Sequence, residues 1–196
     1  EALVARALAD EGVTADPAHL AAALGSMLAA LRGHDLWATL AGARRRLAEL
    51  PFVTRIGPVE VEGIIDLLVE TADGRWCVID YKSDRVTAAT AARRAGHYGL
   101  QMAVYASAAA RRLGLADGKV SAALYFLRPA LACPVDVAAM NAAEVERRVT
   151  HLADRLAACR AEDRWPGRED GDCASCRFVR LCHRKSVVSD PPARYS

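Results

Sequence analysis

The chain has 196 residues, of which 53% are hydrophobic and 26% are charged. A chain of this size folds as one domain with a substantial core, and the composition excludes an intrinsically disordered protein. No apolar run approaches the roughly 20 residues that a membrane-spanning helix needs, so we expect no membrane association. The net charge of +2 is too small to identify a polyanionic partner, so any surface that binds nucleic acid must be local.

The first fifty residues are rich in alanine and leucine and have helical periodicity, interrupted near residues 12–17 and at Gly33. They predict a helical layer over residues 1–50, including a helix over residues 34–50. The chain begins with Glu1 rather than methionine, inside a segment that already has helical periodicity. We therefore expect it to be a piece excised from a longer protein.

The character of the sequence changes at Pro51, where β-branched residues become frequent. Residues 51–70 and 75–82 are typical of strands, and the sequence TADG between them is typical of a hairpin turn. The pattern then predicts a helix within residues 87–113, a strand over 119–128, an edge strand over 131–137 and a long amphipathic helix over 141–162. The expected fold is α/β, with a small mixed central sheet flanked by helices. Residues 51–140 carry the sheet, and residues 141–196 form a long helix and a loop-rich tail.

Two aspartates lie in the first pair of expected strands, Asp66 in one and Asp80 in the other. If residues 72–74 form a three-residue loop with Gly74 in the left-handed conformation, Asp66 lies directly opposite Asp80. Their Cβ atoms are then about 5 Å apart. A two-residue Asp-Gly loop would instead place Asp66 opposite Tyr81, with the two carboxylates on different faces of the sheet.

Two ionised carboxylates this close, in otherwise apolar strands, repel each other and are costly to desolvate. A divalent cation removes both costs, and oxygen ligands favour Mg²⁺ or Mn²⁺. Lys82 lies on the same strand face as Asp80, where it can orient or help deprotonate the attacking water and stabilise developing negative charge. Asp66, Asp80 and Lys82 therefore predict a metal-assisted phosphodiesterase site. The alternative is that Asp66 caps a turn while Asp80 and Lys82 form an exposed pair, but we favour the catalytic interpretation because the flanks are apolar.

These residues resemble the signature of the PD-(D/E)xK nucleases, with Asp66 followed by Asp80-Tyr81-Lys82. The longer segment GIIDLLVETADGRWCVIDYKSD is similar to the RecB/AddA branch, which is found in bacterial helicase-nucleases. The resemblance implies a restriction-endonuclease-like core. It also implies that Asp66 and Asp80 ligate the metal together with the Tyr81 carbonyl, and that Lys82 is the catalytic lysine.

Residues 98–105, YGLQMAVY, resemble the QxxxY motif of the same branch. This resemblance implies that Gln101 and Tyr105 line the site and help hold the DNA strand. Helical spacing also places Tyr98 and Met102 on the same face as these two residues. Core packing by Tyr98, Met102 and Tyr105, with Gln101 at the edge, explains the same spacing equally well, so both interpretations stay open.

Members of this family usually carry a metal-binding histidine in a GxxxH-type helix before these strands. The sequence has no such motif, and we expect His19 and His34 to be surface residues. We expect the missing histidine to lie upstream of Glu1. In that case this piece alone has an incomplete metal site, and we expect it to be weak or inactive.

Three cysteines, Cys173, Cys176 and Cys182, lie within ten residues near the end of the sequence. The start of the chain has no secretory pattern, so we expect a reducing bacterial cytosol, where such a cluster binds metal. The spacing resembles the iron-sulfur staple of AddB-type and CRISPR-adaptation RecB-like nucleases. We expect a 4Fe-4S cluster, with zinc as the second choice and unmetallated thiols as the third.

Such a cluster normally needs four ligands, so one is missing from the local set. The resemblance implies a cysteine upstream of Glu1, and the internal candidates are Cys133, Cys159 and His183. AddA-type chains, which the nuclease core resembles most, generally lack this cluster, so the type of subunit stays open. Cys77 is expected to be a core residue that faces away from the carboxylates.

Together these features predict a Mg²⁺-dependent deoxyribonuclease domain. We expect this domain to act as an exonuclease on single-stranded DNA ends in recombination and repair. The resemblance implies a helicase motor in the same chain or complex, and a second helicase-nuclease subunit as a partner. The sequence itself has no GxxxxGK[ST] motif for ATP hydrolysis. The alternatives are a non-catalytic DNA-binding or scaffold module that has kept the fold, and a zinc-binding interaction module.

Overall fold

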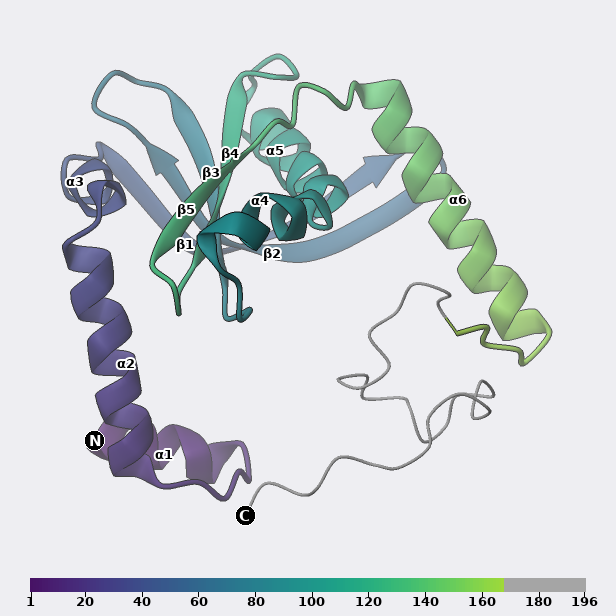
Figure 1. Cartoon of the computed structure of the whole chain (residues 1–196). Coiled ribbons are helices and arrows are strands. Elements are labelled where there is room, and N and C mark those ends of the chain that lie inside the picture. Colours follow the sequence, from purple (N-terminus) through teal and green to yellow (C-terminus); the bar gives the residue numbers. More distant parts are fainter. Residues whose placement is uncertain (168–196) are drawn as a thin grey trace. The chain divides into compact units, whose positions relative to one another are not determined.

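The computed structural model describes residues 1–167 of the chain. Residues 1–148 form one compact unit, and the described residues from 149 on belong to a second. The first unit contains a five-stranded sheet with helices on both faces (Figure 1). In chain order the elements are α1 (Ala2–Asp10), α2 (Pro17–Arg32), α3 (Asp35–Ala41), β1 (Arg45–Ile56), β2 (Val59–Glu70), β3 (Trp76–Lys82), α4 (Ala88–Gly96), α5 (Gly99–Leu113), β4 (Val120–Phe126), β5 (Leu131–Val135) and α6 (Ala142–Ala161).

The sheet has the strand order β1-β2-β3-β4-β5, with β3 and β4 parallel and all other neighbours antiparallel. The expectation of a small mixed sheet flanked by helices is confirmed. Parallel neighbours need a crossover connection, and α4 and α5 supply it between β3 and β4. The expected edge strand is also confirmed, because β5 pairs only with β4 among the described strands and carries Pro134, a residue that sheet edges tolerate.

The sheet separates two hydrophobic clusters. On one face, buried side chains of α4 and α5 pack against β2, β3 and β4, with Ile65, Leu68 and Met102 at the centre. On the other face, Leu31 at the end of α2 and Leu40 of α3 pack against the alternate side chains of the same three strands. Consecutive side chains alternate between the two clusters along β3 and along residues 67–69 of β2. The alternation breaks at Asp66, because Ile65 and Leu68 belong to the same cluster.

The expected helix over residues 34–50 is wrong beyond residue 41. Residues 45–50 begin β1, which pairs with β2 from Arg45↔Glu70 to Ile56↔Val59 with one gap, at Glu49. The segment RRLAEL has good local helix formers, but pairing with β2 gives its backbone groups ladder hydrogen bonds. Tertiary pairing therefore outweighs local propensity here.

The expectation of a surface position is confirmed for His19 and wrong for His34. His19 is exposed, whereas His34 is half-buried at the start of α3. The His34 Nδ1 atom accepts a hydrogen bond from the Leu36 amide at 3.0 Å, which caps the helix, and its ring packs edge-on against Tyr125 at 5.4 Å between centroids. His34 is thus a structural residue on the cluster between α3 and the sheet.

The remaining helices follow the expected positions with one interruption. Residues 87–113 form two helices rather than a continuous one, because the chain turns at His97 and Tyr98 between α4 and α5. The weak helix formers Gly96 and Gly99 flank this turn. The long helix α6 lies where the amphipathic pattern places it, and no helix within residues 1–167 is long and apolar enough to cross a membrane.

Candidate active site

The turn between β2 and β3 has the three-residue geometry that brings the two aspartates together. Glu70 pairs with Trp76, the Thr71 amide donates to the Arg75 carbonyl at 2.8 Å, and Gly74 has φ 81°. Residues 72–74 therefore form the loop, with glycine in the left-handed conformation that it adopts at low cost. The same register, continued along the hairpin, places Asp66 opposite Asp80.

The Asp66 carboxylate lies at the point where β2 and β3 stop pairing. The recorded backbone register runs from Glu70↔Trp76 to Leu67↔Ile79 and goes no further. One step beyond, the Tyr81 amide donates a hydrogen bond to Asp66 Oδ2 at 2.8 Å, so a side-chain oxygen takes the place of a strand carbonyl. Asp66 is thereby held between the diverging strands.

The Tyr81 carbonyl points toward the same gap. The Lys82 carbonyl accepts from the Leu127 amide at 2.9 Å and so points toward β4. Successive carbonyls of a strand point in opposite directions within the sheet, which directs the Tyr81 carbonyl toward β2 and Asp66. Its side chain points to the other face, in the cluster that contains Ile79 and Tyr125.

Asp80 is the most deeply buried acid of the described chain, with 2% of its surface exposed. Its Oδ1 atom accepts a hydrogen bond from Gln101 Nε2 at 3.2 Å. Its Oδ2 atom accepts no hydrogen bond of acceptable geometry from residues 1–167 and instead forms an ion pair with Lys82 Nζ at 2.6 Å. Burial raises the pKa of Asp80, Lys82 opposes this increase, and the negative charge of Asp66 adds to it.

The amide of Gln101 connects the charged pair to α5. Lys82 Nζ donates to Gln101 Oε1 at 3.4 Å, and Gln101 Nε2 also donates to the Tyr105 hydroxyl at 3.0 Å. The Tyr105 ring packs edge-on against Phe52 of β1, at 5.5 Å between centroids. The spacing is compatible with lining the site and with core packing, and this face of α5 does both. Gln101 contacts the charged residues, while Tyr105 packs against the core.

The donor atoms at this point of the sheet fit a small hard cation. Residues 1–167 hold no group of three or more His, Cys, Asp or Glu side chains placed to bind a metal. The set here is two carboxylates, Asp66 and Asp80, and the Tyr81 carbonyl, all of them oxygen donors. Mg²⁺ and Mn²⁺ accept few protein oxygens and keep several waters. Asp80 Oδ2 is buried and accepts no well-aligned hydrogen bond within residues 1–167, so cationic groups balance its charge, here the Lys82 ammonium.

Glu49 is a feature of this region that the sequence did not reveal. Ala48 pairs with Leu67 and Leu50 with Ile65, so Glu49 is the β1 residue at the position opposite Asp66, and no pair is recorded for it. Its φ of 49° is left-handed, which costs a non-glycine residue about 1 kcal/mol or more. The ladder of β1 and β2 is therefore locally interrupted beside Asp66, and no motif or turn signal in the sequence indicates this.

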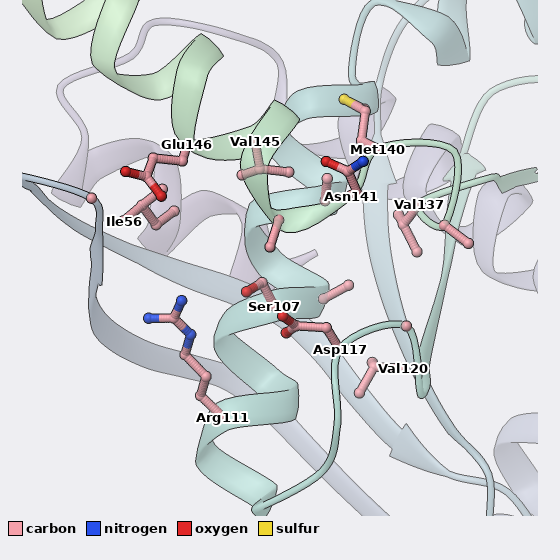
Figure 2. A pocket seen from close by; sticks show the side chains of 16 residues that line it. Ile56, Ser107, Arg111, Asp117, Val120, Val137, Met140, Asn141, Val145 and Glu146 are labelled. Atoms are coloured by element: carbon pink, nitrogen blue, oxygen red, sulfur yellow. The ribbon is translucent and has the colours of Figure 1, made fainter.

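A separate pocket of about 360 Å³ lies beside α5, the turn between β1 and β2, and the start of α6 (Figure 2). Ser107, Arg111, Asp117 and Glu146 surround it, and Arg111 Nη1 donates to the Arg55 carbonyl at 2.6 Å. None of the carboxylates, the lysine or the glutamine described above lines it. The chemistry of the paired carboxylates therefore belongs to the end of the β2–β3 ladder and not to this pocket.

The cysteine cluster of Cys173, Cys176 and Cys182, and with it His183, lies outside the described residues. Cys77 is half-buried in the cluster between α3 and the sheet, so the expectation of a core residue facing away from the carboxylates is confirmed. Cys133 is half-buried against the α4 and α5 cluster, and burial raises the pKa of its thiol. Cys159 lies in α6 and is half-buried.

Comparison with known proteins covers most of the chain. The family model described as the PD-(D/E)XK nuclease superfamily matches residues 1–183. Among solved structures, the one titled "Crystal structure of SSO0001" has a TM-score of 0.45 and 18% sequence identity, and the match covers 82% of this chain and 69% of that chain. A search of curated proteins gave no significant match.

Proposed function

From its membership of the PD-(D/E)XK nuclease superfamily, to which the match over residues 1–183 shows that the chain belongs, we propose that it is a Mg²⁺- or Mn²⁺-dependent deoxyribonuclease domain. The observation that carries the proposal is the ion pair of Lys82 with the buried Asp80, next to Asp66, whose carboxylate accepts from the Tyr81 amide where the β2–β3 pairing ends. An ordinary surface ion pair needs neither the burial nor the second carboxylate.

In this proposal Asp66, Asp80 and the Tyr81 carbonyl would hold the cation, which would supply Lewis acidity and help to activate the attacking water. Lys82 keeps an ammonium group at the same place, where it orients the attacking water and stabilises negative charge that develops on the phosphate. Gln101 fixes Asp80 and Lys82 relative to each other through one amide group. Tyr105 in turn fixes the orientation of Gln101.

The test uses the full chain with an end-labelled single-stranded oligonucleotide, with Mg²⁺ or Mn²⁺ and with a chelator. We expect slow cleavage that needs the cation, because the chain lacks the GxxxH histidine of related sites. We expect Asp80→Asn to lower kcat further, by roughly 100-fold or more, because an amide does not replace a carboxylate as a cation ligand. Asp117→Asn is the matched control, since this exposed acid lines the separate pocket. Equal activity of Asp80→Asn and the wild type would reject the site. DNA binding without cleavage under any of these conditions would favour the non-catalytic module.

We further propose that the domain is of the RecB/AddA type and acts on DNA ends for a helicase motor in the same protein or complex, with a second helicase-nuclease subunit as a partner. The support is the order of the aspartate segment, the DYK segment and the QxxxY segment in the sequence. The hydrogen bond of Gln101 to Asp80 adds to this support. Faster degradation of single-stranded ends than of closed circular single strands is the expected result, and equal rates on both would count against it.

The cysteine spacing supports a 4Fe-4S cluster at Cys173, Cys176 and Cys182, with zinc as the alternative metal. Protein purified without oxygen should absorb visible light at about 400 nm, and this absorbance should be lost in Cys176→Ser. Stoichiometric zinc in a colourless protein would favour the alternative. The matched control is Cys77→Ser, because Cys77 packs in the core of the sheet.

A further inference from the structure

The ammonium group of Lys82 has an aromatic neighbour in addition to its two polar ones. Lys82 Nζ lies 4.4 Å from the centroid of the Tyr98 ring, within the distance at which a cation is attracted to an aromatic face. The Lys82 side chain is only 16% exposed, so water screens this attraction less than it would at an open surface. The Tyr98 ring thus forms part of the surroundings of the charged pair.

Tyr98 is itself held by two charged residues that the sequence analysis did not identify. Its hydroxyl donates to Asp84 Oδ2 at 2.9 Å, and Arg94 Nε donates to Asp84 Oδ1 at 2.6 Å. The Arg94 guanidinium lies 5.3 Å from the same ring. The three residues come from the loop after β3, from α4 and from the turn before α5. They fix the ring at the place where these elements meet.

The protonation states of this group support a fixed ring. Burial raises the pKa of Tyr98, and the carboxylate of Asp84 raises it further, so the phenol keeps its proton and remains a donor. Burial alone would raise the pKa of Asp84, but hydrogen bonds from Tyr98 and Arg94 outweigh it and lower the pKa. A phenol that donates to a carboxylate has a more electron-rich ring, which attracts a cation more strongly.

The Tyr98 ring also gives Lys82 a partner that does not depend on the paired carboxylates. Asp80 Oδ2 is the ionic partner of Lys82, and in the proposed site the divalent cation would compete for this oxygen. When that oxygen is engaged, Lys82 needs other partners to stay at the site, because like charges repel. Gln101 Oε1 and the Tyr98 ring are the two that the described structure supplies.

We propose that Tyr98 is a positioning residue for Lys82, whose ammonium it retains beside Asp80, and that Asp84 and Arg94 hold the Tyr98 ring for this purpose. This inference rests on the proposed nuclease function for its consequence in catalysis. The contact between ring and ammonium can be tested without any activity.

The first experiment observes Lys82 directly by NMR with ¹³C-labelled lysine in the full chain. The sequence has three lysines, Lys82, Lys119 and Lys185, so Lys82→Arg identifies the signal. We expect the Lys82 ε protons at higher field than those of Lys119, because protons above a ring face are shielded. The shift should persist in Tyr98→Phe and disappear in Tyr98→Leu. An unshifted Lys82 signal in the wild type, or a shift that survives Tyr98→Leu, would overturn the inference.

The second experiment compares kcat and KM on the same oligonucleotide. Loss of a partly desolvated cation–π contact should lower kcat roughly tenfold in Tyr98→Leu, with KM nearly unchanged. Tyr98→Phe keeps the ring and should retain most of the activity, with Asp84→Asn between the two. The matched control is Trp37→Leu, which removes the contact of Arg32 with the Trp37 ring, at 5.9 Å in a different part of the fold.

The outcomes separate this inference from the proposed function. An equal decrease of kcat in Tyr98→Phe and Tyr98→Leu, or an unchanged kcat in Tyr98→Leu, would overturn the positioning role while nuclease activity stands. A wild type that neither cleaves the oligonucleotide nor gains thermal stability from Mn²⁺ would overturn the proposed function, and the NMR comparison would still decide the contact. Tyr98→Met serves as a second variant without an aromatic ring, and thermal unfolding of each variant shows that it is folded.

Discussion

The amide of Tyr81 donates its hydrogen bond to the carboxylate of Asp66, at 2.8 Å, where the backbone pairing of β2 and β3 ends. The Asp66 side chain thus accepts the hydrogen bond of a strand amide that has no backbone partner, and it also presents a negative charge opposite Asp80. One Asp66 oxygen, Oδ2, serves the backbone. Stability and the proposed cation binding can therefore be separated at this residue.

Asp66→Asn and Asp66→Ala should differ in stability but not in activity. Asparagine keeps an acceptor for the Tyr81 amide and removes the repulsion of Asp80, so the free energy of unfolding should stay near the wild-type value. Alanine leaves the amide without its partner and should lower the free energy of unfolding by about 1–2 kcal/mol. Both variants should lose metal-dependent cleavage. Urea denaturation and the oligonucleotide assay measure the two effects, and equal stability of the two variants would contradict the role of the hydrogen bond.

Asp80→Asn should stabilise the protein at neutral pH. Burial raises the pKa of Asp80 above its unfolded value of about 3.9, so the folded state binds the proton more tightly than the unfolded state. The contribution of Asp80 to stability is therefore greatest below pH 4 and falls as pH rises through the folded pKa. Asparagine resembles the protonated form. The variant should be more stable than the wild type at pH 7, by a margin that shrinks toward pH 4.

Asp73→Asn should change the free energy of unfolding in the opposite direction to Asp80→Asn, in the same denaturation measurements. Hydrogen bonds from Thr71 and then Arg75 lower the pKa of Asp73 to about 2. This carboxylate therefore stabilises the fold above pH 4, and that contribution is lost as pH falls toward 2. Asp73→Asn should be less stable than the wild type at pH 7, with the difference shrinking in acid. The same sign for both variants would contradict the assignment of the two environments.

Divalent cations should raise the melting temperature of the wild type through the two carboxylates. A cation at ten times its Kd stabilises the folded state by about 1.4 kcal/mol, which corresponds to about 3–6 °C for a domain of this size. The increase should be absent in Asp80→Asn and retained in Asp117→Asn. Thermal unfolding with Mn²⁺ and with chelator measures it. An equal increase in all three proteins would indicate binding elsewhere.

Two glycines should respond in opposite directions to alanine. Gly74 has φ 81° in the β2–β3 turn, where a Cβ is strained, so Gly74→Ala should lower the free energy of unfolding by about 1 kcal/mol. Gly25 lies inside α2 with open space around its Cα, so Gly25→Ala should raise it by up to about 1 kcal/mol. Chemical denaturation of both variants checks the pair. A neutral Gly74→Ala would contradict the left-handed turn.

The hairpin is the part of the site that follows most directly from the amino-acid order. Only a few adjacent residues set the loop between β2 and β3, and the pleat of the strands then carries that register from Gly74 to Asp66 and Asp80. The same local rules explain the break near residues 12–17 and the long helix α6. They also place Tyr81 and Cys77 on the face away from the carboxylates.

Packing between distant segments decided the remaining features. Residues 45–50 are a strand because β2 lies beside them, although their own propensities favour a helix. The φ of Glu49 and the ring of Tyr98 above Lys82 depend on neighbours that are far away in the chain. Turn geometry and the alternation of side chains along a strand depend on a few neighbouring residues, so they can be predicted from the amino-acid sequence. Contacts across the fold arise from the sum of many weak interactions, and only the folded chain determines which of them form together.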